Sequence, residues 1–218
     1  IVMDDGTTTR ISENHYHMTT TTAQAANVLS HLEYYLQIIW PELKVNVIST
    51  TEQWAGAALA GPKSRDLLAK LFPDLNVSNK ALPFMGYTEG NLFGIKAKIF
   101  RISFSGELAY EINVESNYGL FMWEKIMEIG KEFYIQPYGT EALSFLRIEM
   151  GHVAGPELDG RTIPYDVSLE GLVSNKKDFI GKRSLQKEAF NISDRQKLVG
   201  LVPTDKKTNI PEGSHLVM

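Results

Sequence analysis

The clearest alternation of apolar and polar residues lies in the middle of the chain. Residues 96–104 and 109–114 carry apolar side chains at every second position, the period of a β-strand, and Ser105 and Gly106 between them are typical of a turn. One face of the second strand is formed by Tyr110, Ile112 and Val114. Glu111 therefore projects from the other face, as a carboxylate in an otherwise apolar segment.

This carboxylate has two interpretations. Spacing alone favours a face that is simply exposed to solvent. Alternatively, Glu111 holds a flat ligand, because a carboxylate accepts two parallel hydrogen bonds from a planar pair of N–H groups. A reduced pterin ring presents such a pair, its ring N–H beside its exocyclic amino group.

Strands and helices alternate along the rest of the chain. Helical spacing of apolar residues predicts helices over residues 23–39, 61–72, 118–131 and 139–149, and a short helix ending near residue 190. Further strands are predicted over residues 1–11, with a turn at Asp5 and Gly6, and over residues 15–19, 45–51, 54–60 and 197–203. Residues 73–94 and 151–164 are predicted to be loops. The alternation predicts an α+β fold.

Composition narrows the class of protein. The chain has 218 residues, no cysteine and a net charge of −4, with acidic and basic residues interspersed. The missing cysteines exclude disulfides, thiolate catalysis and cysteine-ligated metal sites. The charges form no basic patch for nucleic acid and no polybasic segment for a membrane surface. No apolar run approaches the ~20 residues of a membrane span and no signal-peptide pattern is seen, so we expect a cytoplasmic protein with small ligands or soluble partners.

Two further patterns are missing, and the ends of the chain are unusual. The five histidines show no metal-ligand spacing, so we expect no metal site. No Gly-x-Gly-x-x-Gly loop, the pattern that holds a flavin or nicotinamide dinucleotide, occurs in the sequence. The chain opens at Ile1 and closes at Met218, and neither end has the pattern of a natural terminus. We therefore expect it to be part of a longer polypeptide.

A series of motifs resembles a known family. The stretch Phe104-Ser-Gly-Glu-Leu-Ala-Tyr-Glu111 resembles the aromatic-Thr-Gly-Glu-x-x-aromatic-Glu element of the folate-binding aminomethyltransferases, the glycine-cleavage T-protein family. Within this superfamily the chain is similar to the C-terminal region of the alpha subunits of heterotetrameric sarcosine oxidases. That similarity also rests on Asp4-Asp-Gly-Thr-Thr8, Met18-Thr-Thr-Thr-Thr22, Thr51-Glu-Gln-Trp54, Pro137-Tyr-Gly-Thr-Glu141 and Lys177-Asp-Phe-Ile-Gly181. The resemblance covers essentially the whole chain.

The resemblance implies a particular fold and domain organisation. The fold is the aminomethyltransferase type, with two sheet-and-helix lobes around a central funnel. Residues 1–190 would form the folate-binding region, incomplete at its N-terminus. Residues 191–218 would form the beginning of a truncated C-terminal β-barrel domain.

The resemblance also implies a catalytic residue. Spacing alone would make Asp4 and Asp5 ordinary turn residues. In the family, however, the aspartate at the position of Asp5 lies beside the reactive edge of tetrahydrofolate. A one-carbon unit joins folate nitrogen through an iminium cation, which a fixed carboxylate stabilises and whose released proton it accepts.

Four further positions are implied to line the folate pocket. Glu111 takes the position of the glutamate that holds the pterin. Phe104 stands where the family usually has tyrosine, so it forms a wall of the pocket without a hydrogen bond. Thr21 falls opposite a family asparagine at the pocket floor, and Tyr110 is the second aromatic residue of the 104–111 element.

A further position departs from the family. T-proteins carry an arginine early in the helix that ends Leu-Arg-x-Glu-x-Gly, and Leu143 stands there in this chain. Arg147 and Glu149 match the family, and we expect them to form an ion pair that supports the site, with Arg147 also a candidate ligand contact. Loss of the other arginine disfavours a protein-bound aminomethyl donor and agrees better with a sarcosine-type oxidase.

The resemblance thus implies the tetrahydrofolate-binding region of a sarcosine oxidase, which receives the imine or formaldehyde from oxidised sarcosine and delivers 5,10-methylenetetrahydrofolate. Three alternatives remain: a glycine-cleavage aminomethyltransferase, a non-catalytic folate-binding assembly module, whose cysteine-containing signature this chain lacks, and a structural docking domain. Amine oxidation needs a hydride acceptor that no side chain supplies. We therefore expect FAD, FMN and NAD only in other regions or subunits, in particular a flavin-bearing beta subunit, and no sarcosine oxidation by this chain alone.

Overall fold

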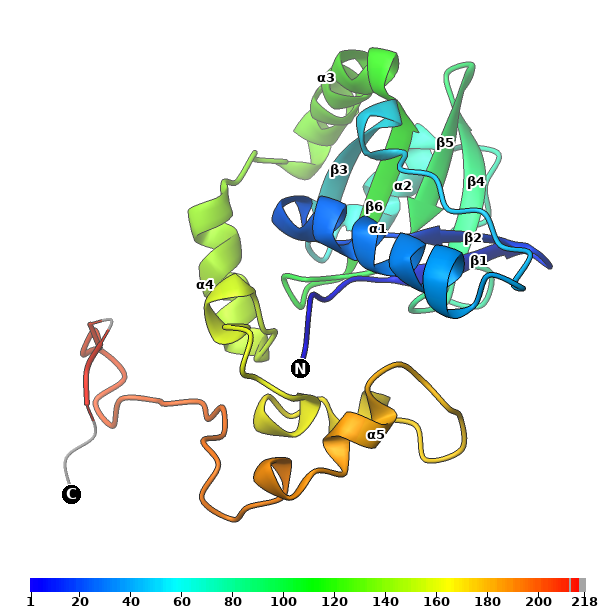
Figure 1. The fold of residues 1–218 in the computed structure, drawn as a ribbon. Coiled ribbons are helices and arrows are strands. Elements are labelled where there is room, and N and C mark those ends of the chain that lie inside the picture. The colour runs from blue at the N-terminus through cyan, green and yellow to red at the C-terminus, as the bar shows by residue number, and fades with distance from the viewer. Residues whose placement is uncertain (212, 216–218) are drawn as a thin grey trace. The chain divides into compact units, whose positions relative to one another are not determined.

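The protein is represented by a computed structural model that describes residues 1–211 and 213–215. The chain divides into two compact units, coloured along the sequence in Figure 1. Residues 3–155, which we call the sheet unit, contain the strands β1 to β6 and the helices α1 to α4. The described part of residues 156–218, together with residues 1–2, forms the second unit, which contains α5.

A four-stranded antiparallel sheet forms the centre of the sheet unit. Its strands are β3 (Trp54–Ala60), β4 (Tyr87–Leu92), β5 (Ile95–Phe100) and β6 (Ala109–Glu115), in the order β3-β6-β5-β4. The alternation along the sequence predicted β3, β5 and β6. It missed β4, because Gly90 and Asn91 interrupt the apolar pattern of a strand that is completed by pairing with β5. The mixture of sheet and helix confirms the α+β class.

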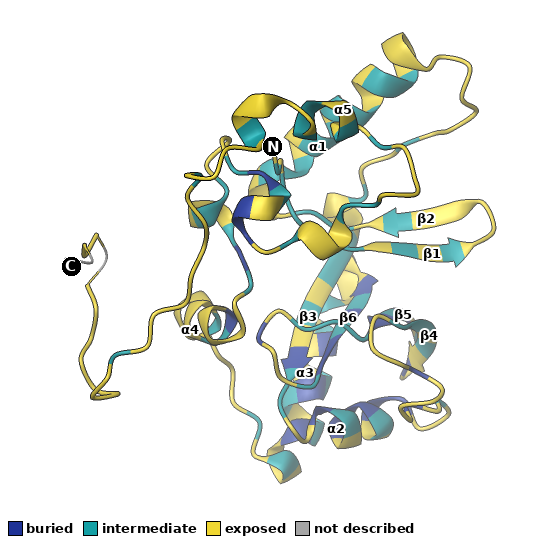
Figure 2. Cartoon of the chain, turned by 90° about the horizontal axis from the view of Figure 1, so that it is seen from below, coloured by how far each residue is buried: buried dark blue, intermediate teal, exposed yellow. Residues whose placement is uncertain are grey.

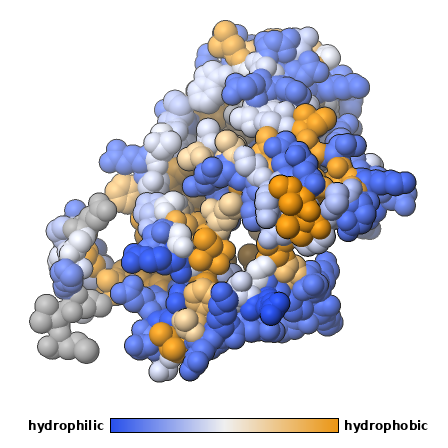
Figure 3. Space-filling model, viewed as in Figure 1, coloured by the Kyte–Doolittle hydropathy of each residue, from blue (hydrophilic) through white to orange (hydrophobic). Residues whose placement is uncertain are grey.

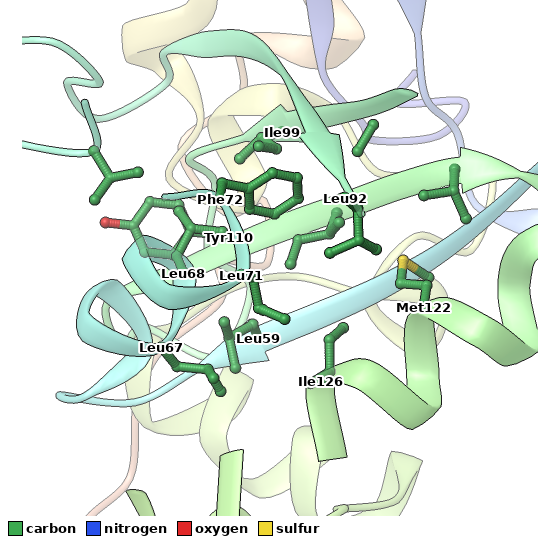
Figure 4. Packing of buried hydrophobic residues seen from close by; sticks show 14 of the residues in the cluster. Leu59, Leu67, Leu68, Leu71, Phe72, Leu92, Ile99, Tyr110, Met122 and Ile126 are labelled. Carbon is green, nitrogen blue, oxygen red and sulfur yellow. The ribbon is translucent and has the colours of Figure 1, made fainter. Parts of the chain in front are cut away.

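The two faces of this sheet differ in polarity. Tyr110, Ile112 and Val114 of β6 are fully buried on one face. The helices α2 (Ser64–Leu71) and α3 (Gly119–Gly130) pack on that face. Figure 4 shows side chains of both helices in this core, among them Leu67, Leu68, Leu71, Met122 and Ile126. Figure 2 shows the same division, with buried residues gathered on β5, β6, α2 and α3.

A hairpin of β1 (Thr8–Ser12) and β2 (His15–Met18) forms a second sheet. Its turn lies at residues 13–14, so the predicted turn at Asp5 and Gly6 is wrong. Gly6 is needed for a different reason. A Cβ atom at this position would lie 2.0 Å from the carbonyl oxygen of Thr19, which shows how closely the two backbones pack.

The predicted helix over residues 23–39 is present, in three consecutive parts. They are a 3-10 turn (Thr22–Gln24), α1 (Ala25–Tyr34) and a π-helical turn (Tyr35–Ile39). None of the residues in these parts is buried, so α1 does not contribute to the core.

In the space-filling view, hydrophobic groups lie among the hydrophilic residues that cover most of the visible surface (Figure 3).

The strand predicted over residues 45–51 is absent. Its residues are mostly exposed, and a 3-10 turn (Thr51–Gln53) leads from it into β3. Valine, isoleucine and threonine favour a strand only when a neighbouring strand packs against them. No strand of the described chain pairs with this segment.

The helix α4 (Thr140–Met150) completes the sheet unit, and α5 (Lys182–Leu185) lies in the second unit. In the second unit, Arg195 Nε donates to Asp166 Oδ1 at 2.9 Å and holds the pKa of that carboxyl below its ordinary value. The strand predicted over residues 197–203 is not found. Leu198 donates one backbone hydrogen bond to the carbonyl of Asp166, but no strand of the described residues lies beside the segment to pair with it. Residues 212 and 216–218 of the predicted barrel segment lie outside the described residues.

None of the described helices has the length and apolar character needed to cross a membrane.

The core packing predicts different roles for two leucines. Leu68 is 0% exposed, whereas Leu120 on α3 is 71% exposed. Leu68→Ala should lower the free energy of unfolding by about 2–5 kcal/mol, because it removes buried methyl groups and leaves a cavity. Leu120→Ala, the control, should change that free energy by less than about 0.5 kcal/mol. Urea unfolding followed by circular dichroism measures both, and equal losses would contradict the packing.

Candidate functional site

Glu111 lies at the centre of the polar face of the four-stranded sheet. Its register partners are Ala58 on β3 and Phe100 on β5. The side chain is half-buried, and burial raises the pKa of its carboxyl above the ordinary value. No described residue donates a hydrogen bond to this carboxylate. A carboxylate in such a place is costly until a donor reaches it, which suits a position that binds a ligand.

Small and aromatic side chains flank Glu111. On one side lies β3, where Ala58 and, two residues earlier on the same face, Gly56 have little or no side chain. On the other side the ring of Phe100 stacks on His17 of β2, with centroids 5.6 Å apart, and lies 5.0 Å from the ring of Tyr87. The carboxylate therefore has small side chains on the β3 side and large aromatic side chains on the β5 side.

A lysine on the same face adds positive charge. Lys98 pairs with Asn113, and its Nζ lies 3.9 Å from the centroid of the Trp54 ring. Burial lowers the pKa of Lys98, and Glu89 opposes this effect. Burial and the nearby Lys98 also lower the pKa of His17. Both side chains are half-buried, so water is partly excluded from this face of the sheet.

The two neighbouring aspartates have different surroundings. Asp4 accepts hydrogen bonds from the backbone N–H and from the hydroxyl of Thr21, both at 2.9 Å. Asp5 is half-buried, and the pKa of its carboxyl is raised, mainly by burial and then by Asp4, while His152 lowers it. Asp4 therefore fixes the start of the helical segment at Thr21, and the described residues give Asp5 no comparable pair of hydrogen bonds.

His152 is attached to the 104–111 stretch by two contacts. Its Nδ1 donates a hydrogen bond to the carbonyl oxygen of Phe104 at 2.8 Å. Its ring stacks on the ring of Phe104, with centroids 5.6 Å apart and an angle of 15° between planes. The reason lies at the end of α4, where Gly151 adopts a left-handed conformation (φ 73°) and turns the chain so that the N–H of His152 donates to the carbonyl of Arg147.

Arg147 supports this turn, and the predicted ion pair with Glu149 is wrong. Arg147 is buried and donates from Nη1 to the carbonyl oxygen of His152 at 3.1 Å. Glu149 is exposed. Residues two positions apart on an α-helix point in directions about 200° apart, so the two side chains diverge.

Four of the predicted site residues fall into two groups at the ends of the 104–111 stretch. Phe104 and Arg147 contact His152 at one end, where His152 also lowers the pKa of Asp5, and Glu111 lies at the other end. Thr21 is linked to this arrangement through Asp4. That Asp5 and Glu111 face one cavity stays a prediction.

Tyr110 lies away from these groups. Its side chain is fully buried in the core, on the face of β6 opposite Glu111, and Figure 4 shows it among Leu68 and Phe72. Burial raises the pKa of its phenol, and no described residue bonds to its hydroxyl. The structure thus places Tyr110 beneath the sheet, where it supports the strand that carries Glu111.

Two histidines near the candidate residues were not predicted from the sequence. His152 carried a usable signal, because a glycine that follows a helix often reverses the chain and brings the next side chain back toward the helix. His17 carried a weaker one, its position in an alternating strand. Neither histidine has metal-ligand spacing along the sequence, and no cluster of three possible ligands occurs among the residues that the structure describes.

Comparison with known proteins identifies the family. A family model described as the GCVT N-terminal domain matches residues 1–177. The chain belongs to this family. The resemblance inferred from the 104–111 stretch is therefore confirmed, and the GCVT match covers all the predicted site residues.

Two names occur among the relatives compared with this GCVT chain. A sarcosine oxidase subunit alpha from Rhizobium meliloti is 48% identical over 219 residues, which are 99% of this chain and 22% of that protein. The protein of the same name from Corynebacterium sp. (strain P-1) is 48% identical over 100% of this chain and 23% of its own length. An aminomethyltransferase from Chloroherpeton thalassium is 28% identical over 99% of this chain and 57% of its own length. The chain thus spans less than a quarter of the two sarcosine oxidase subunits.

The raised pKa of Glu111 predicts how stability depends on pH. Folding disfavours the ionised form of Glu111, because burial raises the pKa of its carboxyl. The contribution of Glu111 to stability is therefore complete below the pKa of the unfolded chain, about 4.3, and is lost as the pH rises through the higher pKa of the folded protein. Glu111→Gln cannot ionise. Its free energy of unfolding, relative to that of the unmodified protein, should therefore increase between about pH 4 and pH 7.

Urea unfolding at several pH values measures this difference. Glu115→Gln is the matched control, because Glu115 lies on the same strand and is exposed. The difference for Glu111→Gln should change with pH more than the difference for the control does. A Glu111→Gln difference that stays constant would contradict the burial of this carboxylate.

Proposed function

We propose that this chain is a tetrahydrofolate-binding region that captures a one-carbon unit released by amine oxidation. The observation that carries the proposal is the half-buried carboxylate of Glu111, which has no donor from any described residue. The names of the relatives support the reaction class. Two of them are sarcosine oxidase alpha subunits, and another is an aminomethyltransferase.

The surroundings of Glu111 fit a flat, two-donor ring. A carboxylate with both oxygens available accepts a parallel pair of N–H donors, and such a charge-assisted pair is stronger and more directional than a neutral hydrogen bond. Ala58 leaves space beside the carboxylate, while Phe100 and His17 offer ring surfaces. These features support Glu111 as the residue that binds and orients the pterin of the folate.

Asp5 is proposed as the catalytic residue. When bound, tetrahydrofolate supplies the nucleophilic nitrogen that takes up a carbon at the oxidation level of formaldehyde. The carboxylate of Asp5 stabilises the positive charge that develops and accepts the released proton, tasks that suit a half-buried carboxyl with a raised pKa. Asp4 and Thr21 hold the segment that carries Asp5 through two hydrogen bonds.

Phe104 and Arg147 are proposed as supporting residues. The ring of Phe104 is 38% exposed and can form a wall of the pocket. The stacked ring of His152 and its hydrogen bond to the Phe104 carbonyl oxygen fix the position of Phe104. Arg147 acts through the backbone of His152 in this proposal, because its Nη1 bonds to the His152 carbonyl oxygen. Tyr110 acts by supporting β6 from below.

The remaining parts of the activity are proposed for a larger assembly. Oxidation of sarcosine requires a flavin or nicotinamide. In this proposal a flavin-bearing subunit of a sarcosine oxidase complex supplies it and passes the one-carbon unit to this chain. The second candidate function is aminomethyl transfer of the glycine-cleavage type, favoured by the relatives named aminomethyltransferase.

The proposal predicts a specific loss in Glu111→Gln. An amide offers one acceptor to two donors, so binding of 5-formyltetrahydrofolate should weaken by about 1–3 kcal/mol, roughly tenfold to a hundredfold. Isothermal titration of the purified chain measures this affinity. The exposed Glu115→Gln on the same strand is the control and should bind as the unmodified protein does. Equal affinities of the two variants for 5-formyltetrahydrofolate would contradict the assignment of Glu111 to the binding site.

The proposal predicts the opposite pattern for Asp5→Asn. Its affinity for 5-formyltetrahydrofolate should stay within about threefold of normal, because the cation that Asp5 stabilises is absent from the resting complex. The rate of 5,10-methylenetetrahydrofolate formation from sarcosine in the assembled complex should fall about a hundredfold or more. An equal loss of affinity in Asp5→Asn and Glu111→Gln would contradict this division of labour.

A further inference from the structure

A cavity of about 590 Å³ lies beside β3, one of the two outer strands of the four-stranded sheet. Its walls come from β3, from the segment between β3 and α2, from α3, and from residues 133–140 with Leu143 of α4. Glu111, Asp5, Phe104 and His152 are not among its lining residues. Gly56 and Ala58, which flank Glu111, do line the cavity, so it adjoins the proposed folate site on β3 without including the carboxylates assigned above to folate.

The lining of the cavity is rich in large aromatic side chains that water reaches. Trp123 is 45% exposed, Tyr134 is 81% exposed and Tyr138 is 41% exposed, and all three line the cavity. Tyr134 also has a left-handed backbone (φ 60°), which is uncommon for a residue with a bulky side chain. Exposed aromatic rings gathered around a hollow are typical of a surface that binds an apolar or aromatic group.

A single charged residue faces this lining. Of the residues that line the cavity, Lys63 alone carries a charge. Its Nζ lies 5.2 Å from the centroid of the Tyr134 ring. No described carboxylate forms an ion pair with Lys63. The cavity thus offers one cation and many apolar contacts, which complements a ligand with one negative charge on an aromatic body.

The volume agrees with a small molecule. Binding sites for such ligands usually measure about 300–1,000 Å³ and combine an apolar lining with a few polar groups that fix orientation. Here Lys63 lies at the entry to α2, and Leu143 belongs to the apolar wall. We propose that this cavity is a second binding site, which takes an amphipathic monoanion with its aromatic body against Trp123 and Leu143 and its anionic end at Lys63.

Two matched probes test the proposal. The anion 1-anilinonaphthalene-8-sulfonate and the uncharged N-phenyl-1-naphthylamine share nearly the same aromatic body, and both fluoresce when they leave water. Lys63→Gln should weaken binding of the anion about tenfold and leave binding of the uncharged probe unchanged, because only the anion loses a charge-assisted contact. Lys63→Arg should restore the affinity for the anion. Leu143→Trp, which fills part of the cavity, should weaken both probes.

The control is Lys80→Gln, which removes an exposed lysine that does not line the cavity. It should leave both affinities unchanged. An equal loss of affinity for the anionic probe in Lys63→Gln and Lys80→Gln would overturn the proposal. Unchanged binding of both probes in Leu143→Trp would also overturn it. An equal effect of Lys63→Gln on both probes would also overturn it.

Two more measurements distinguish this cavity from the folate site and from a contact between two copies of the chain. Excess 5-formyltetrahydrofolate should not displace the anionic probe, and displacement would assign the cavity to the folate site instead. Sedimentation velocity should show a monomer at the protein concentration of the titration. A dimer that excludes both probes would mean that a second copy of the chain covers this edge of the sheet, and the proposal would then be wrong.

Discussion

The pairing of β6 between β3 and β5 is the constraint on which the rest of the sheet unit depends. The antiparallel register on both sides fixes which residues of β6 face the helices and which face away from them. Tyr110, Ile112 and Val114 enter the core because their backbone neighbours hold them there, and Glu111 must then project from the opposite face. A slip of one residue would drive the carboxylate into the core and the apolar side chains into water. The stability of the core and the position of the candidate ligand-binding residue are therefore set by the same backbone hydrogen bonds.

The two aspartates near the N-terminus show how surroundings separate the tasks of identical residues. Asp4 receives two hydrogen bonds from Thr21, so its negative charge is satisfied within the protein. Asp5 receives no comparable pair from the described residues and is influenced by burial, by Asp4 and by His152. One carboxylate organises the backbone, and the other keeps the ability to exchange a proton or meet a cation.

Much of the fold could be predicted because it follows from local patterns. Alternation located β3 and β6, and helical spacing located α3 and α4, since each of these elements buries one face. The failures have a different origin. β4 exists because β5 pairs with it, and residues 45–51 are not a strand because no described strand pairs with them. At the candidate site, the period of two predicted the side to which Glu111 points, whereas the contact between His152 and Phe104 joins residues 48 apart in the chain and leaves no periodic trace.

The hydrogen bond from His152 to the Phe104 carbonyl has a consequence for the imidazole itself. A carbonyl oxygen can only accept, so Nδ1 must keep its proton whether the ring is neutral or charged. The tautomer of the neutral ring is thereby fixed, and Nε2 is the ring nitrogen that can accept a hydrogen bond. The stacked ring of Phe104 restricts rotation of the imidazole and so keeps Nε2 in one direction. The orientation of His152 is thus set by a backbone carbonyl and an aromatic ring rather than by another polar side chain.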